Sequence, residues 1–93
     1  MIEVTTKSGF HCMVDPRILD DWDVIEALAD SADANMAIQS RGNVEVMQKV
    51  FGQEGLQALK KHVRDKNGFI STTLMIKELT DVLIACGNAG KKS

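Results

Sequence analysis

The chain has 93 residues with a net charge of −2; 44% of them are hydrophobic and 26% are charged. This size and composition predict one globular domain over residues 1–93, and the charge argues against a general nucleic-acid binder, which carries a basic surface. No apolar run approaches the roughly 20 residues that span a bilayer, and no signal-peptide core opens the chain, so we expect an intracellular protein.

Residues 1–14 predict a β-hairpin. Two β-prone runs, IEVTT and FHCMV, alternate approximately between apolar and polar side chains, and the turn-forming KSG separates them. An isolated hairpin is marginally stable, so we expect it to pack on helices. Asp15 and Pro16 then form a helix-start pair, in which a capping carboxylate precedes proline at the first helical position.

An acidic helix capped by Asp20 or Asp21 is predicted next. The side chains that recur at helical spacing, and that we expect to face the core, are Trp22, Ile25, Leu28, Ala29 and Ala32. Seven acids and one arginine give residues 15–33 a charge of −6, whereas five acids and nine bases give residues 34–93 a charge of +4. The opposite charges of these two segments could stabilise the monomer, promote head-to-tail association of copies or match a partner with a polarised surface. They could also simply be solvated surface charges.

The remaining chain predicts a loop and three helices. Residues 31–43 have weak periodicity and several helix breakers, so we expect a short helical turn and a loop there. The next helix is capped by Asn43 and ends at Gly52, and another runs from Gln53 to a stop at Asn67 and Gly68. The inward residues expected in these two helices are Val44, Met47, Val50, Phe51, Leu56, Leu59 and Val63.

The last helix restarts at Ser71 or Thr72 and carries a wide apolar face. Its central stripe contains Met75, Leu79, Val82, Leu83 and Cys86, and the flank beside it contains Leu74, Ile76 and Ile84. The predicted fold class is therefore α+β: a hairpin over residues 1–14, about four helices over residues 15–88 and a flexible polar tail over residues 89–93.

Residues 63–74, VRDKNGFISTTL, partly match a calcium-binding EF-hand loop. Asp65, Asn67 and Gly68 fall at the third, fifth and sixth positions of the twelve-residue pattern. However, the first position is Val63 and the twelfth is Leu74, where an acidic ligand and a bidentate glutamate belong. We therefore interpret the segment as a joint between two helices and expect no metal.

Other chemical motifs are weak. A DNA-binding helix-turn-helix would need a basic second helix, whereas Lys77 is its only base before the tail. Cys12 and Cys86 form no CxxC pair and are expected to be buried thiols in a reducing cytosol, and His11 and His62 stand alone. No nucleophile motif or phosphate-binding loop is present, so we expect no catalytic residues, no cofactor and no enzyme activity.

The order of three segments carries a family resemblance. SGFHCMVDPRILDDWDVIEALAD, then VMQKVFGQEGLQALKKHVRDKNGFISTTLMIKELTDVL, then GNAGKKS resemble the small tail assembly chaperones of long-tailed bacteriophages and of prophages in Gram-positive bacteria. Residues 31–43 and the ending KKS depart from that family's pattern. The resemblance implies binding of the long helical tape measure protein, self-association, contact with the tail tube protein, and no nucleic-acid or membrane partner. It also implies residence in the host bacterial cytoplasm and absence from the mature virion.

Partner contacts are predicted from the exposed apolar positions. The first choice is the flank of the last helix, Leu74, Ile76 and Ile84, and the second is Trp22 with Val24, although spacing also favours a core position for Trp22. The alternatives to an assembly chaperone are a small DNA-binding regulator, a structural phage tail or connector component, and a calcium sensor.

Overall fold

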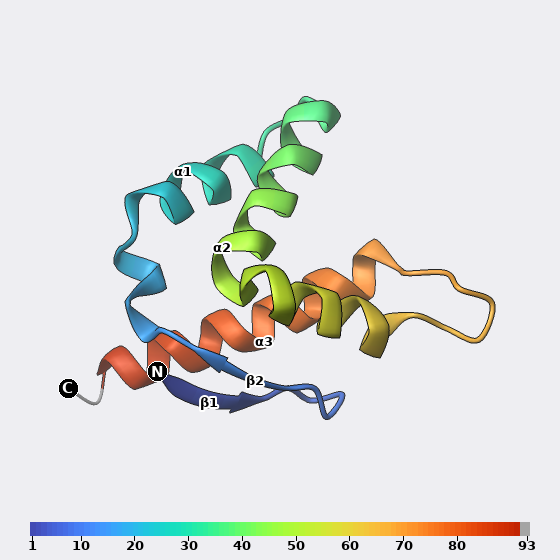
Figure 1. Ribbon diagram of the computed structural model, residues 1–93. Helices are drawn as coiled ribbons and strands as arrows, with labels where there is room; N and C mark the ends of the chain where they lie inside the picture. Colours follow the sequence, from blue (N-terminus) through green and yellow to red (C-terminus); the bar gives the residue numbers. More distant parts are fainter. Residues whose placement is uncertain (92–93) are drawn as a thin grey trace.

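The computed structural model describes the backbone of residues 1–91 and the side chains of residues 1–88. The elements follow in the order β1 (Ile2–Thr5), β2 (His11–Val14), the 3-10 helix η1 (Pro16–Asp20), α1 (Trp22–Ser31), α2 (Met36–Val63) and α3 (Thr72–Lys91). Figure 1 shows α1 beside the first part of α2, and the hairpin and the last part of α2 along α3. None of the helices in residues 1–91 has the length and apolarity required to cross a membrane.

The hairpin prediction is confirmed. β1 and β2 are antiparallel, with Ile2 opposite Val14 and Val4 opposite Cys12. The tight loop between them is closed by Thr6, whose backbone amide donates to the Phe10 carbonyl over 2.8 Å and whose hydroxyl accepts from the Phe10 amide over 3.1 Å. These bonds turn the Phe10 side chain into the core, where it is only 6% exposed.

The predicted helix starts after the hairpin are also confirmed. Asp15 accepts a hydrogen bond from the Arg17 amide over 2.9 Å, and Pro16 is the first residue of η1. Asp21 in turn caps α1 by accepting from the Asp23 amide over 2.9 Å. Two caps six residues apart leave space only for the short 3-10 helix between them, so the chain changes direction before α1 begins.

The inward face of α1 differs from the prediction. Val24 and Ala27 are buried at 0% and 1% exposure, whereas Trp22 is 70% exposed and Ile25 is 41% exposed. The reason is the contact with α2 at Gly42, where an added Cβ would lie 2.7 Å from the Ala27 carbonyl oxygen. The small residue Ala27 permits this approach, and Trp22 and Ile25 remain exposed to solvent. Leu28 is partly buried against the core, as predicted.

Helix α2 begins earlier than predicted. The segment expected to form a loop is helical from Met36, because the Asn35 side chain accepts from the Ala37 and Ile38 amides over 2.9 and 3.4 Å. Gly42, a residue type that disfavours helices, lies inside this helix and serves the close contact with α1. In this helix Val46 faces the core at 0% exposure, whereas Val44, which is predicted to face inward, is 52% exposed.

Gly52 divides α2 into two arms. Its φ of 70° and ψ of 175° lie in a region that only glycine occupies readily. The backbone at Gly52 is not helical, so α2 breaks where an end is predicted, although its two arms run on without a loop between them. Residues 1–91 therefore contain three α-helical elements instead of about four. Figure 1 shows the first arm beside α1 and the second arm turning to run along α3.

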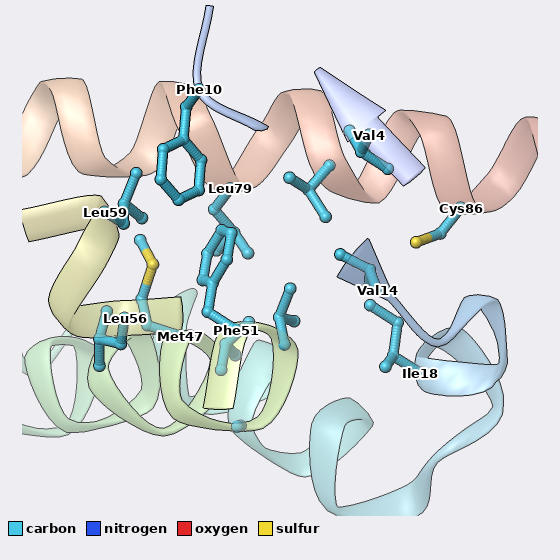
Figure 2. Packing of buried hydrophobic residues seen from close by; sticks show 14 residues of the cluster. Val4, Phe10, Val14, Ile18, Met47, Phe51, Leu56, Leu59, Leu79 and Cys86 are labelled. Atoms are coloured by element: carbon cyan, nitrogen blue, oxygen red, sulfur yellow. The ribbon is translucent and has the colours of Figure 1, made fainter. Parts of the chain in front are cut away.

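The core lies between the two arms of α2, the hairpin and α3. Figure 2 shows Phe10, Phe51 and Leu79 pointing toward one another, and the Phe10 and Phe51 rings meet edge to face with centroids 6.2 Å apart. Apart from Val44, the residues predicted to face inward in α2 and α3 are confirmed as fully or partly buried: Met47, Val50, Phe51, Leu56, Leu59, Val63, Met75, Leu79, Val82, Leu83 and Cys86.

The end of α3 lies beyond the predicted boundary. The helix starts at Thr72 after Ser71, whose hydroxyl accepts from the Leu74 amide over 3.3 Å, as expected. It then continues to Lys91, although a flexible tail is predicted from residue 89 onward. Residues 92–93 of that predicted tail lie outside the described residues.

Replacing Gly52 tests the break in α2. Gly52→Ala should lower the free energy of unfolding by about 1–3 kcal/mol, because alanine resists this backbone conformation. Its Cβ would meet nothing within 4 Å, so the cost comes from the backbone alone. Gly87→Ala is the matched control, since that Cβ would lie 3.9 Å from Leu19 Cδ1 in ordinary contact, and it should leave stability equal or slightly higher. Urea denaturation compares them; equal stability of the two variants would contradict the assigned conformation.

The Asp15–Arg17 pair predicts a dependence of stability on pH. Hydrogen bonds from the Arg17 side chain and amide lower the pKa of Asp15 to about 2 from an ordinary 3.8. The stabilisation is therefore present above about pH 4 and is lost as the pH falls toward 2. Asp15→Asn should be slightly less stable than the parent protein at pH 7, and the difference should shrink below pH 4. Urea midpoints at several pH values measure this, with the exposed Asp20→Asn as control.

Candidate functional site

An open hollow of about 580 Å³ lies where the β1–β2 loop meets the second arm of α2 and the first half of α3. We call it the hairpin groove. Its apolar wall includes the predicted partner residues Leu74 and Ile76, and charged side chains stand around them. The residues that line it are Lys7, Ser8, His62, Val63, Leu74, Ile76, Lys77, Glu78, Thr80 and Asp81.

One polar cluster joins three separate parts of the chain in this groove. The Ser8 hydroxyl donates to a Glu78 carboxylate oxygen and lies 3.0 Å from His62 Nε2. The same hydroxyl lies 3.2 Å from the Thr6 hydroxyl. Because the single hydroxyl hydrogen of Ser8 goes to Glu78, its contact with His62 requires the histidine to donate from Nε2. We call Thr6, Ser8, His62 and Glu78 the Ser8 cluster.

Because its carboxylate is buried, the Ser8 cluster connects the hairpin loop to the helices. The Glu78 residue is only 4% exposed, and burying a carboxylate is costly unless it is hydrogen-bonded or paired. Ser8 supplies the hydrogen bond, and His62 Nε2 lies 3.8 Å from the same carboxylate oxygen. The Lys7 amide also donates to Asp81 over 3.0 Å. Together these contacts fix the hairpin loop to α2 and α3.

The geometry of the Ser8 cluster differs from that of a catalytic triad. In a triad the serine contacts one nitrogen of the histidine, and the carboxylate holds the other nitrogen. Here the carboxylate bonds the serine directly, and both Ser8 and Glu78 approach the same nitrogen of His62, Nε2. We therefore assign these three residues the role of holding the loop in place.

Sequence reasoning missed the Ser8 cluster, although it left one signal. Ser8 is 54 residues from His62 and 70 residues from Glu78, so no local spacing links them. The signal is Glu78 itself, which follows Met75 by three residues and precedes Val82 by four. A carboxylate on the buried stripe of a helix needs a polar partner, although the sequence does not say which residue supplies it.

The structure separates the five predicted partner residues. Leu74 and Ile76 line the hairpin groove at 46% and 37% exposure. Ile84 is 56% exposed farther along α3 and does not line this groove, and Trp22 is exposed on α1. Val24 is 0% exposed, so the prediction that it meets a partner is wrong.

Apolar surface continues from the hairpin groove around Ile76. A second hollow of about 240 Å³ opens between the two arms of α2 and the start of α3, and Ile76 lines it as well. Its apolar lining includes Val44, Ile70 and Met75. Accessible apolar surface thus extends to both sides of the first turns of α3.

The loop between α2 and α3 is stabilised by the carboxylate of Asp65, which lies within it. Asp65 accepts hydrogen bonds from the Asn67 and Phe69 amides over 2.8 and 3.0 Å, which shapes the loop from inside. Among residues 1–88, no three His, Cys, Asp or Glu side chains gather as a metal site would require. The side chain at the third EF-hand position therefore serves the turn.

The two cysteines are unpaired thiols with little access to solvent. Cys86 is buried and Cys12 is partly buried. Burial raises the pKa of Cys12, and the nearby Cys86 and Glu78 raise it further. Burial also raises the pKa of Cys86, with a smaller contribution from Asp15. Because the thiolate is the reactive form, both groups are poor nucleophiles at neutral pH.

Comparison with known family models, with curated proteins and with solved structures finds no match to this chain.

Removing the Ser8 hydroxyl tests the structural role of the cluster. Ser8→Ala should lower the free energy of unfolding by about 1–3 kcal/mol at pH 7, since the buried Glu78 carboxylate loses its donor. The loss should be smaller in a Glu78→Gln background, because an amide costs less to bury than a carboxylate. Urea denaturation of the four proteins forms a double-mutant cycle. Ser40→Ala, at an exposed position of α2, is the control and should leave stability unchanged.

Proposed function

We propose that this protein is a tail assembly chaperone that binds the tape measure protein and keeps it in solution until tail tube subunits polymerise around it. The observation that carries the proposal is the exposed pair Leu74 and Ile76 in the hairpin groove. The resemblance of residues 8–30 and 46–83 to that family supports the same function.

The groove has the chemistry that an amphipathic helix requires. Val63, Leu74 and Ile76 provide an apolar wall for the apolar stripe of such a helix. Lys7, Lys77 and Asp81 stand beside them and suit polar residues at the borders of the stripe. A long helical protein that exposes apolar stripes before assembly would find in this groove a temporary substitute for its final contacts.

A chaperone of this kind has to release its client. Only a few apolar side chains line the groove, and each is already partly buried in the free protein, so the additional area covered on binding is small. Such an interface gives modest affinity, which polymerising tube subunits can overcome. The proposal includes self-association, contact with the tail tube protein, action in the host cytoplasm and absence from the finished virion, without nucleotide hydrolysis.

Co-expression with a tape measure fragment tests this function. The parent protein should raise the soluble fraction of the fragment and co-purify with it. Leu74→Ser combined with Ile76→Ser should weaken the complex about thirtyfold, because about 1 kcal/mol of apolar burial is lost at each side chain. Met36→Ser is the control, since Met36 is 77% exposed but does not line the groove. Circular dichroism checks that all variants remain folded.

Three results would count against the proposal. The first is a tape measure fragment that precipitates equally with and without the protein. The second is detection of the protein in purified virions, which would favour a structural tail or connector component. The third is retardation of duplex DNA with a steep salt dependence, which would favour a DNA-binding regulator.

A further inference from the structure

Helix α1 exposes an apolar face that its own fold does not use. Trp22 is 70% exposed and Ile25 is 41% exposed, while the buried side of the helix, with Val24 and Ala27, packs toward α2. Trp22, Ile25 and the exposed Ala29 recur at three- and four-residue spacing and therefore form one stripe. We call this stripe the Trp22 face.

The Trp22 ring is held in place at the surface. Its indole nitrogen donates a hydrogen bond to the Glu26 carboxylate one turn later. The only polar atom of the side chain is therefore satisfied, and the rest of the ring offers apolar area to solvent. A fixed aromatic ring loses little freedom when a partner covers it, which is why tryptophan often dominates binding interfaces.

Carboxylates stand directly beside the Trp22 face. A hollow of about 380 Å³ between α1 and α2 is lined by Asp23, Glu26, Asp30, Glu45, Gln48 and Lys49. Lys49 lies 3.3 Å from Asp23, so one base opposes four acids and the hollow keeps a negative balance. An acidic partner is repelled here, whereas lysine or arginine side chains beside an apolar stripe are attracted.

We propose that α1 docks a cationic amphipathic helix of another polypeptide. The apolar stripe of that helix covers Trp22 and Ile25, and its lysine or arginine side chains enter the hollow beside Asp23, Glu26 and Asp30. The ten residues of α1 extend about 15 Å, which matches about three turns of the partner and two or three basic residues. This docking does not involve the hairpin groove, so it goes beyond the chaperone function and is tested separately.

A second copy of this chain fits the Trp22 face less well. The most basic segment among residues 1–88 is the end of α2, with Lys60, Lys61 and His62 in the last turn. The apolar residues of that arm, Leu56 and Leu59, are buried in its own core at 8% and 0% exposure. This arm would bring charge to α1 without an apolar stripe, whereas a foreign amphipathic helix brings both.

Trp22 itself reports the docking. It is the only tryptophan and the chain has no tyrosine, so its fluorescence can be followed selectively. A helical peptide of leucine and lysine, about 14 residues or 21 Å long, should shift the emission to shorter wavelength and reach saturation. Raising the salt to about 1 M, where the Debye length is about 3 Å, should weaken binding. The same peptide with glutamate in place of lysine should leave the spectrum unchanged.

Matched variants locate the contact. Glu26→Gln with Asp30→Asn should weaken lysine-peptide binding about five- to tenfold, through the loss of two charge pairs. Glu3→Gln with Glu54→Gln removes the same net charge away from α1 and should have little effect. The proposal is overturned if both peptides shift the emission equally, if neither does, if both double variants weaken binding equally, or if concentrating the protein alone produces the shift. Leu74→Ser should leave binding of the lysine peptide intact, which shows that this binding does not occur in the hairpin groove.

Discussion

The break at Gly52 is the constraint on which the rest of the fold depends. A straight helix of 28 residues would extend about 42 Å and could place only one stripe against one neighbour. With the bend, the first arm of α2 packs on α1 through Gly42, and the second arm packs along α3. Phe51, directly before the bend, then meets Phe10 from the hairpin in the shared core. The backbone conformation of Gly52 thus lets the two arms of α2 contact α1, α3 and the hairpin.

Local signals in the sequence predicted the elements more reliably than their contacts. The capping groups of Asp15, Asp21 and Ser71 act within a few residues, so reading the sequence located these helix starts. The inward side of α1 could not be read in this way, because apolar residues occur on more than one side of that helix. The choice between the sides depends on Gly42, which lies in a different helix and resembles a helix breaker in the sequence.

In the candidate site, too, local features could be predicted from the sequence whereas tertiary contacts could not. Exposure of Leu74 and Ile76 follows from their place beside the buried stripe of α3, and periodicity alone indicates it. The partners of Glu78 could not be predicted, since Ser8 comes from the hairpin loop and His62 from α2, and only the packing of these elements on α3 brings them to it. Helical spacing favours a core position for Trp22, and only the packing of α1 shows that it faces solvent.

The short strands of the hairpin have a consequence for behaviour at high concentration. β1 and β2 have four residues each, and a sheet of two strands leaves one edge of each strand unpaired. Long flat edges recruit further strands and start aggregates, whereas short edges offer too few backbone groups to do so. The twisted pair is also fixed against α3 by the bonds of Ser8 and Lys7. Edges as short as these reduce the tendency of neighbouring copies to pair strand against strand when the protein is concentrated.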